Sequence, residues 1–305
     1  MTTAPTTVPD PYRRDPAHWG VSLAHMAPLM FPALEAVGAR RIVEVGAYAG
    51  DLTEVLANWA EGAGAHVEAI DPSPQPGLSE LAAAREVVEL TEHTSLDAMP
   101  VMERPDAIVI DGDHNYFTVR REVEILVERF PGGTLPLVFF HDVCWPHARR
   151  DDYFDVTQIP QEYRHPVAGF QGGVLPEEPG LVPGGGLFYE RSATFEGGAR
   201  NGVLTAIEDV VAETPGLRLV VIPGFFGLGA LWHTDAPWSA AVEGVLGPWD
   251  RHPVLEALEA NRVHHLTRRF VPQATGGGRA RRLVNAAPPV LRRAIAKTRA
   301  RVARS

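Results

Sequence analysis

The chain has 305 residues, of which 45% are hydrophobic and 22% are charged, a composition typical of a globular protein with a substantial core. Its single cysteine excludes an internal disulfide. The longest apolar runs have the length of strands, so we expect no membrane span. The first residues lack the apolar core of a secretory signal, which predicts a cytoplasmic protein.

The formal net charge of −10 is unevenly distributed along the chain. From Arg262 to Ser305 there are 12 basic and no acidic side chains, so the first 261 residues hold the other 16 basic and all 38 acidic ones. An acidic body lacks the Lys and Arg that phosphate contacts require, so we expect no nucleic-acid partner. The Arg-rich tail is expected to be a solvated helix or a disordered end, with contact to a membrane surface or a polyanion as the alternative.

Helix and strand patterns alternate through the first half of the chain. A helix predicted at residues 22–37 precedes strands predicted at residues 40–45, 66–70, 87–90, 106–111 and 135–140. Helices predicted at residues 52–59, 79–85 and 119–130 fall between these strands. Such alternation predicts an α/β, Rossmann-like fold, with a mostly parallel sheet, helices on both faces, and ligands at the carboxyl ends of the strands.

The alternation stops at about residues 144–200, which are rich in Pro, Gly and aromatic residues and which we expect to be a substrate-side insertion. A helix is predicted at residues 201–213, followed by strands at 217–222 and 225–232. The short turn between these strands predicts an antiparallel pair at the edge of what is then a seven-stranded sheet. The expected organisation is an extension with a helix (1–37), a domain (38–250), and a C-terminal helix at 250–265 leading into the tail (251–305).

A glycine-containing turn, Glu44-x-Gly46-x-Tyr48-x-Gly50, follows the first predicted strand. Glycines at such a turn let the backbone bend sharply and let a ligand approach without meeting a Cβ atom. Asp71 ends the next strand, where a carboxylate can accept hydrogen bonds from a ribose. The spacing differs from the dinucleotide and P-loop fingerprints, so a nucleoside is favoured over a pyrophosphate. A purely structural tight turn is the alternative.

This set of residues resembles the cofactor site of the class I S-adenosylmethionine-dependent methyltransferases. The resemblance covers roughly residues 38–232. It implies that the turn binds the amino-acid end of S-adenosylmethionine, that Asp71 binds the ribose, and that the loop after the third strand lies near the adenine. The residues implied in cofactor binding are Glu44, Gly46, Ala47, Tyr48, Gly50, Asp71, Thr94, Ser95, Leu96 and Asp111.

Ionisable side chains follow the fourth and fifth predicted strands, as Asp111 to His114 and as His141-Asp142. Neighbouring parallel strands lie about 5 Å apart, so Asp111 and Asp142 are expected to reach one divalent ion from adjacent strands. Structural alternatives are a turn carboxylate at Asp111, an exposed turn residue at His114, and a simple ion pair at His141-Asp142.

The same plan is similar to the divalent-metal-dependent O-methyltransferases, with two differences. His114 stands where those enzymes have a lysine, and His141 stands where they have the first acid of a pair. The resemblance implies Asp111, His141 and Asp142 as ligands of Mg²⁺ or another divalent cation, with His114 or His141 as the catalytic base. Histidine titrates near neutral pH and suits proton abstraction, whereas as a ligand it weakens the case for magnesium.

Aromatic and basic residues in and after the insertion predict an acceptor pocket, because guanidinium groups bind carboxylates and sugar hydroxyls. The predicted substrate residues are Trp145, Arg149, Arg150, Arg200 and Asn201. A surface loop whose charges pair with one another is the alternative.

The resemblance implies O-methylation of a small hydroxylated acceptor, such as a sugar or a natural product, by a metal-assisted enzyme. Three alternatives remain open from the sequence: a metal-independent N-methyltransferase, a dinucleotide-dependent oxidoreductase, and cofactor binding without catalysis. The sequence also leaves a homo-oligomer open.

Overall fold

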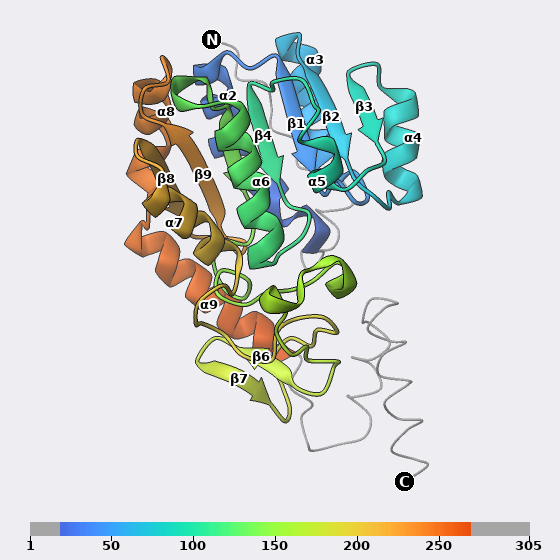
Figure 1. Ribbon diagram of the computed structural model, residues 1–305, viewed down its shortest axis with the longest axis vertical. Coiled ribbons are helices and arrows are strands. Elements are labelled where there is room, and N and C mark those ends of the chain that lie inside the picture. The colour runs from blue at the N-terminus through green and yellow to red at the C-terminus, as the bar shows by residue number, and fades with distance from the viewer. Residues whose placement is uncertain (1–18, 270–305) are drawn as a thin grey trace.

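A seven-stranded sheet organises residues 19–269, the part of the chain that the computed structural model describes (Figure 1). Its order is β3-β2-β1-β4-β5-β9-β8, and only β9 runs antiparallel to its neighbours. The strands are β1 (Arg41–Val45), β2 (His66–Ile70), β3 (Val88–Thr91), β4 (Ala107–Ile110), β5 (Leu137–Phe140), β8 (Leu217–Ile222) and β9 (Leu228–His233). The predicted Rossmann-like sheet with its antiparallel edge pair is confirmed.

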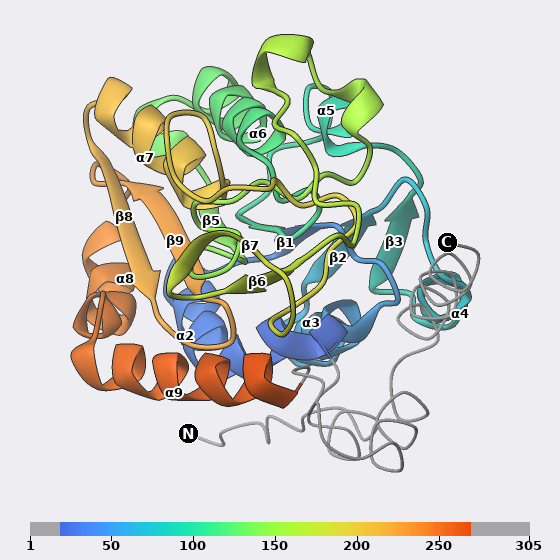
Figure 2. The same cartoon turned by 90° about the horizontal axis from the view of Figure 1, so that it is seen from below.

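Helices cover both faces of this sheet, as the view from below shows (Figure 2). One face carries α5 (Ser95–Ala98), α6 (Tyr116–Arg129) and α7 (Val203–Glu213), and the other carries η1 (Trp19–Met26), α2 (Ala27–Val37), α3 (Asp51–Ala63) and α8 (Ser239–Leu246). The remaining helices are α4 (Pro76–Ala84) and α9 (Pro253–Arg269), with short 3₁₀ turns η2 (Gly132–Thr134), η3 (Val156–Gln158), η4 (Gln161–Tyr163) and η5 (Gly247–Trp249).

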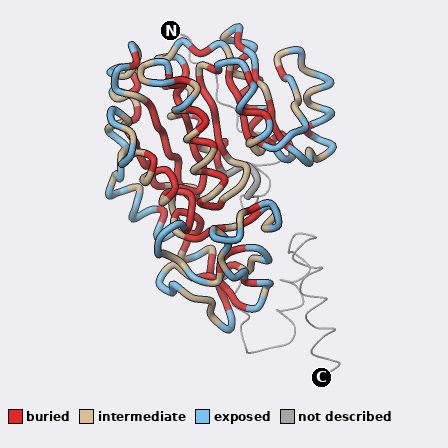
Figure 3. Tube along the Cα trace, viewed as in Figure 1, coloured by how far each residue is buried: buried red, intermediate tan, exposed pale blue. Residues whose placement is uncertain are grey.

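The central strands are buried on both faces, which explains their unbroken apolar sequences (Figure 3). Val109 and Phe139 pack toward α2, α3 and α8, whereas Ile108 and Val138 pack toward α6 and α7. Each strand therefore contributes alternate side chains to two apolar layers, and this arrangement holds the strand ends in a fixed position.

The register of the parallel strands places their last residues side by side. Val45 pairs with both Ile70 and Ile110, and Ile110 pairs with Phe140. The residues that follow these positions therefore begin at the same edge of the sheet. The polar segments that were predicted to bind ligands therefore start at this edge.

The insertion lies beyond this edge and contains a two-stranded sheet, β6 (Gly173–Leu175) and β7 (Glu178–Val182) (Figure 1). The buried Asp151 carboxylate ties it to the domain, because it accepts hydrogen bonds from the backbone N–H of Tyr116 (2.8 Å) and of Gly202 (2.6 Å). Those two residues stand at the starts of α6 and α7. A single buried side chain thus contacts the starts of both helices.

Two boundaries differ from the sequence prediction for identifiable reasons. Helix α6 begins three residues early, because the Asn115 side chain accepts a hydrogen bond from the Thr118 N–H (2.9 Å) and caps the helix there. Strand β9 begins only at Leu228, since Phe225 and Phe226 form a turn with positive φ. Helix α8 and the β6–β7 hairpin were not predicted.

The predicted N-terminal extension up to residue 18 and the Arg-rich tail from residue 270 lie outside the described residues. Within residues 19–269, no helix combines the length and apolar character needed to cross a bilayer.

Candidate functional site

A cavity of about 980 Å³ opens at the carboxyl ends of β1, β2, β4 and β5. The loops that follow these strands form one wall, and several residues between Pro146 and Ile159, together with Tyr189 of the insertion, form the other. Most of the predicted cofactor, catalytic and metal residues line it: Glu44, Gly46, Ala47, Tyr48, Asp71, Thr94, Ser95, Leu96, Asp111, His114, His141 and Asp142.

Gly46 is required by the approach of two loops. Its φ is +84°, and a Cβ atom there would lie 2.3 Å from the carbonyl oxygen of Asp111. The loop after β1 can therefore pass the loop after β4 only with glycine at this position. Gly50, with φ +88°, is the residue before α3 and does not line the cavity.

Asp71 is buried at the end of β2 and connects the first two loops. Its carboxylate accepts hydrogen bonds from the backbone N–H of Tyr48 (2.7 Å) and of Ser73 (2.8 Å). Each carboxylate oxygen can accept a further hydrogen bond, so the pair suits two neighbouring hydroxyls of a ligand.

Glu44 lies deeper in the same wall and is 2% exposed. One of its carboxylate oxygens has no hydrogen-bond partner among the described residues. Burial raises the pKa of Glu44 to about 8, so its carboxyl group is mostly protonated at neutral pH. A cationic ligand group beside it would reverse this shift and provide the missing partner.

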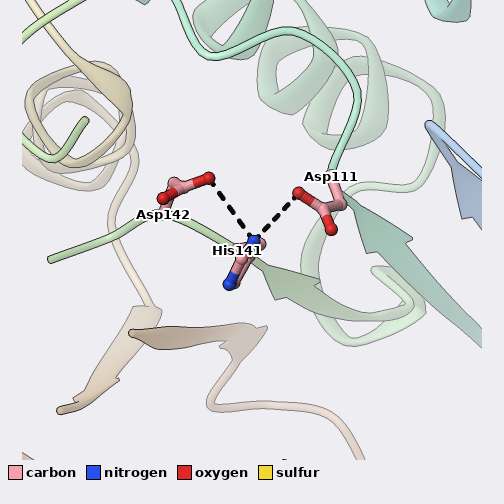
Figure 4. Close-up of side chains that lie close together, drawn as sticks. All are labelled: Asp111, His141 and Asp142. Carbon is pink, nitrogen blue, oxygen red and sulfur yellow. Dashed lines mark hydrogen bonds and ion pairs between the residues drawn. The ribbon is translucent and has the colours of Figure 1, made fainter. Parts of the chain in front are cut away.

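Asp111, His141 and Asp142 form a cluster at the ends of β4 and β5 (Figure 4). One ligand atom from each residue lies within 4.8 Å of the others. His141 Nδ1 is 3.1 Å from Asp111 Oδ1 and 3.4 Å from Asp142 Oδ2. The predicted metal ligands are therefore brought together with donor atoms that suit a divalent cation.

The orientation of His141 is fixed from its far side. Its Nε2 donates a hydrogen bond to the carbonyl oxygen of Phe225 at 2.8 Å. A carbonyl can only accept, so Nε2 carries a proton and Nδ1 faces the two carboxylates. Nδ1 then holds either a second proton or a cation.

His114 lies between the same two carboxylates. Its Nε2 is 3.2 Å from Asp111 Oδ1 and 3.1 Å from Asp142 Oδ2. Burial opposes protonation, but the charges of Asp142 and Asp111 outweigh it and raise the pKa of His114 to about 10. The same balance raises the pKa of His141 to about 9. Burial favours the neutral form of Asp111, yet the two histidines hold its pKa well below the usual range.

The predicted substrate residues lie elsewhere, and none of the five lines the cavity. Arg149 pairs with Glu208 (2.6 Å), Arg150 is buried and donates to the carbonyl oxygen of Ala193 (2.7 Å), and Arg200 stacks on Tyr163. Asn201 accepts a hydrogen bond from the Asp151 N–H (2.7 Å), and Trp145 only precedes the lining residue Pro146. In the insertion these polar side chains satisfy backbone groups and partner charges within the protein itself.

The insertion wall is formed by residues that the sequence analysis did not select: His147, Asp152, Phe154, Asp155, Gln158, Ile159 and Tyr189. Phe117 and Thr118 of α6 and Phe226 of the β8–β9 turn also line the cavity, as does Asp113 after β4. Among the described residues, no Arg or Lys lines the cavity.

Residues 43–143 match a family model described as a methyltransferase domain. The chain therefore contains a methyltransferase domain, and the match covers the loops that form the first wall. No curated protein matches the sequence.

Solved structures with a related fold include the S-adenosylhomocysteine-bound methyltransferase PaMTH1 of Podospora anserina, at 15% identity and a TM-score of 0.43 over 75% of this chain and 89% of that one. Another is the O-methyltransferase TomG of Streptomyces achromogenes, in complex with S-adenosylmethionine, at 15% identity and a TM-score of 0.42 over 69% and 80%. Similarity at this level concerns the fold and carries nothing about an acceptor.

Proposed function

We propose that this chain, which carries a class I S-adenosylmethionine-dependent methyltransferase domain, methylates a hydroxyl oxygen of a small molecule with the help of a divalent cation. One observation supports this most directly. The loops of the methyltransferase motif and the Asp111–His141–Asp142 cluster line the same cavity. A methyl donor in the loops would then lie beside a metal-bound acceptor.

The first wall fits the cofactor on its own chemistry. The buried Glu44 oxygen without a partner suits the ammonium group of the donor, and the Asp71 carboxylate suits the ribose hydroxyls. Ser95 begins the short helix α5 and lines the cavity, and in this proposal it contacts the adenine.

The cluster fits a divalent cation by charge and by geometry. Two carboxylates and the Nδ1 of an oriented imidazole converge, and both carboxylates lie within ion-pair distance of His114 and His141. A cation bound there would lower the pKa of an acceptor hydroxyl and hold its oxygen in place. In this scheme His141 and the two aspartates bind the cation, which orients the acceptor oxygen.

We assign the base role to His114. Its ring stands beside both carboxylates, within reach of a proton released at the same position. As long as no bound cation compensates the negative charges of Asp111 and Asp142, His114 stays protonated at neutral pH. It becomes a base only when their charge is neutralised.

The acceptor is proposed to be neutral or cationic, and rich in hydroxyl groups. Carboxylates such as Asp113, Asp152 and Asp155 line the cavity, with no Arg or Lys among the described lining residues. An anionic acceptor would meet repulsion from these carboxylates, with no Arg or Lys of the described lining to compensate it. The aromatic rings of Phe154 and Tyr189 offer faces for a sugar or a ring system.

Calorimetry with S-adenosylhomocysteine and with NAD tests the cofactor, and transfer of a labelled methyl group to a panel of polyols, amino sugars and catechols tests the acceptor. We expect binding of S-adenosylhomocysteine alone, and transfer that EDTA abolishes and Mg²⁺ or Mn²⁺ restores. A folded protein that ignores S-adenosylhomocysteine contradicts the proposal. Binding of NAD instead would favour the oxidoreductase, and transfer that survives EDTA would reject the metal.

A further inference from the structure

The C-terminal helix α9 contacts the β8–β9 turn of the candidate site through Glu259 and Arg262. This helix lies far beyond residues 43–143, which match the methyltransferase family. Glu259 is nevertheless buried, at 8% exposure, on the side of α9 that meets the turn between β8 and β9. The contacts of that turn define what this carboxylate does.

The turn has a backbone that needs external support. Phe225 and Phe226 are consecutive non-glycine residues with φ of 50° and 71°, in the left-handed region that such side chains rarely adopt. A conformation of this kind persists only where surrounding contacts hold it.

Two backbone hydrogen bonds hold part of the turn, from the Gly227 N–H to the Gly224 carbonyl (2.8 Å) and from the Cys144 N–H to the Phe226 carbonyl (2.7 Å). Glu259 holds the two amides between them. Its Oε2 accepts a hydrogen bond from the Phe225 N–H at 3.0 Å, and its Oε1 accepts one from the Phe226 N–H at 2.8 Å. Arg262, one turn further along α9, donates to both oxygens at 2.7 and 2.6 Å and places its guanidinium 4.4 Å from the ring centroid of Phe226. The buried carboxylate is thus fully paired and holds two adjacent backbone amides.

The Phe225–Phe226 turn also contacts the cluster of Asp111, His141 and Asp142. The Phe225 carbonyl accepts the hydrogen bond from His141 Nε2 at 2.8 Å, and the Phe226 ring packs edge-on against His141 while lining the cavity. The peptide that carries this carbonyl joins Phe225 to Phe226, whose N–H is bonded to Glu259. The direction of the carbonyl therefore depends on Glu259.

We propose that Glu259 is a positioning residue that orients His141, through the Phe225–Phe226 turn, toward Asp111 and Asp142. The part of the proposal that concerns metal affinity rests on the proposed function. The orientation of His141 itself does not, because it is a property of the protein alone.

The test compares Glu259→Gln with Glu256→Gln, an exposed position one turn earlier on the same helix. A Gln offers one acceptor oxygen in place of two, so it cannot hold both amides. The primary readout is the His141 Nε2–H proton in ¹H–¹⁵N NMR, assigned among the 12 histidines by its absence in His141→Asn. This proton is present in every protonation state in which Nε2 donates to the carbonyl.

We expect this proton to be protected from exchange with water in the wild type and in Glu256→Gln, and to exchange about tenfold faster in Glu259→Gln. Mn²⁺ affinity, measured by calorimetry, should fall about tenfold in Glu259→Gln, with S-adenosylhomocysteine binding retained as proof of folding. If Glu259→Gln does not fold, Glu259→Asp, which keeps the charge but is one methylene shorter, is judged by the same criterion.

Unchanged exchange of the His141 proton in a folded Glu259 variant overturns the proposal, even if the variant melts at a lower temperature. If the wild type binds neither Mn²⁺ nor S-adenosylhomocysteine, the proposed function fails, and the exchange comparison still decides the positioning role.

Discussion

The two walls of the cavity are built in different ways. The first wall consists of side chains that stand within a few residues of the end of a parallel strand, such as Glu44, Asp71, Asp111 and His141. The second wall comes from the insertion, which has little regular structure and is held to the domain by buried polar contacts at Asp151. Strand register places the first wall, whereas long-range hydrogen bonds place the second.

This difference determines what a side chain is free to do. In the first wall, helices and strands satisfy the backbone, so polar side chains at the strand ends remain available for ligands. In the insertion, many backbone groups lack a partner in a regular element. The side chains of Arg150 and Asn201 donate hydrogen bonds to backbone carbonyls of the insertion. They are therefore not available to a ligand in the cavity.

The largest effect is expected from Asp142→Asn, which removes one of the two carboxylates that face His114 and His141. Loss of this proposed metal ligand should lower methyl transfer by about 1,000-fold, or ~4 kcal/mol, while S-adenosylhomocysteine still binds. Asp235→Asn, at an exposed position remote from the cavity, is the control and should leave both properties unchanged. Equal activity of the two variants would show that the cluster has no part in the reaction.

Gly46→Ala tests whether the first wall depends on the contact between two loops. The added Cβ would meet the Asp111 carbonyl, so the free energy of unfolding should fall by about 3 kcal/mol in urea denaturation. Gly64→Ala is matched, because Gly64 has φ +65° but nothing within 4 Å of a built Cβ. It should cost only about 1 kcal/mol. Equal losses would mean that strain in φ alone explains Gly46.

Glu122, fully buried in α6 behind the cavity, predicts a pH dependence of stability. Burial raises its pKa to about 8, so the folded state keeps a proton that the unfolded state releases above its usual pKa of 4.5. Stability should therefore fall as pH rises from 4.5 to 8. Glu122→Gln should be at least about 3 kcal/mol more stable than the wild type at pH 8.5, with little difference at pH 4.

Thermal and urea unfolding across this pH range measure the effect of Glu122→Gln. Glu128→Gln, an exposed position on the same helix, should follow the wild-type profile. Parallel profiles for wild type and Glu122→Gln would show that Glu122 keeps an ordinary pKa.

Asp71→Asn separates the two walls by cofactor affinity. An Asn side chain has one acceptor oxygen, so it cannot hold the Tyr48 and Ser73 amides and also bind ribose hydroxyls through both oxygens. We expect S-adenosylhomocysteine to bind about tenfold more weakly, or ~1.4 kcal/mol, by calorimetry. Asp155→Asn, in the insertion wall, should leave this affinity unchanged. A loss in Asp155→Asn as large as in Asp71→Asn would contradict the assignment of the walls.

The smallest effect is expected from Arg149→Gln. Arg149 forms a half-exposed pair with Glu208, so its loss should cost about 0.5 kcal/mol of stability. Once an acceptor is known, its KM should not change. A raised KM for the acceptor in Arg149→Gln, with intact stability, would indicate that the arginines of the insertion do contribute to acceptor binding.

The fold and the first wall could be predicted because their signals are local. Alternating helix and strand patterns gave the sheet, and residues next to strand ends, such as Asp71 and His141, share one edge in any parallel arrangement. The roles of Arg149 and Arg200 could not be predicted, because charge and residue type do not reveal which partner lies nearby after folding. Nor does any local pattern connect Glu259 with His141, since the turn between them forms only in the folded protein.

The central claim is that the methyl donor and the metal occupy one cavity, side by side. Mn²⁺-induced relaxation of the ¹³C-methyl resonance of bound S-adenosylmethionine tests this directly, because the effect falls off steeply with distance. We predict strong broadening in the wild type and none in Asp142→Asn, which should still bind the donor. A wild-type protein that binds both ligands but shows no broadening of the methyl resonance would contradict the account.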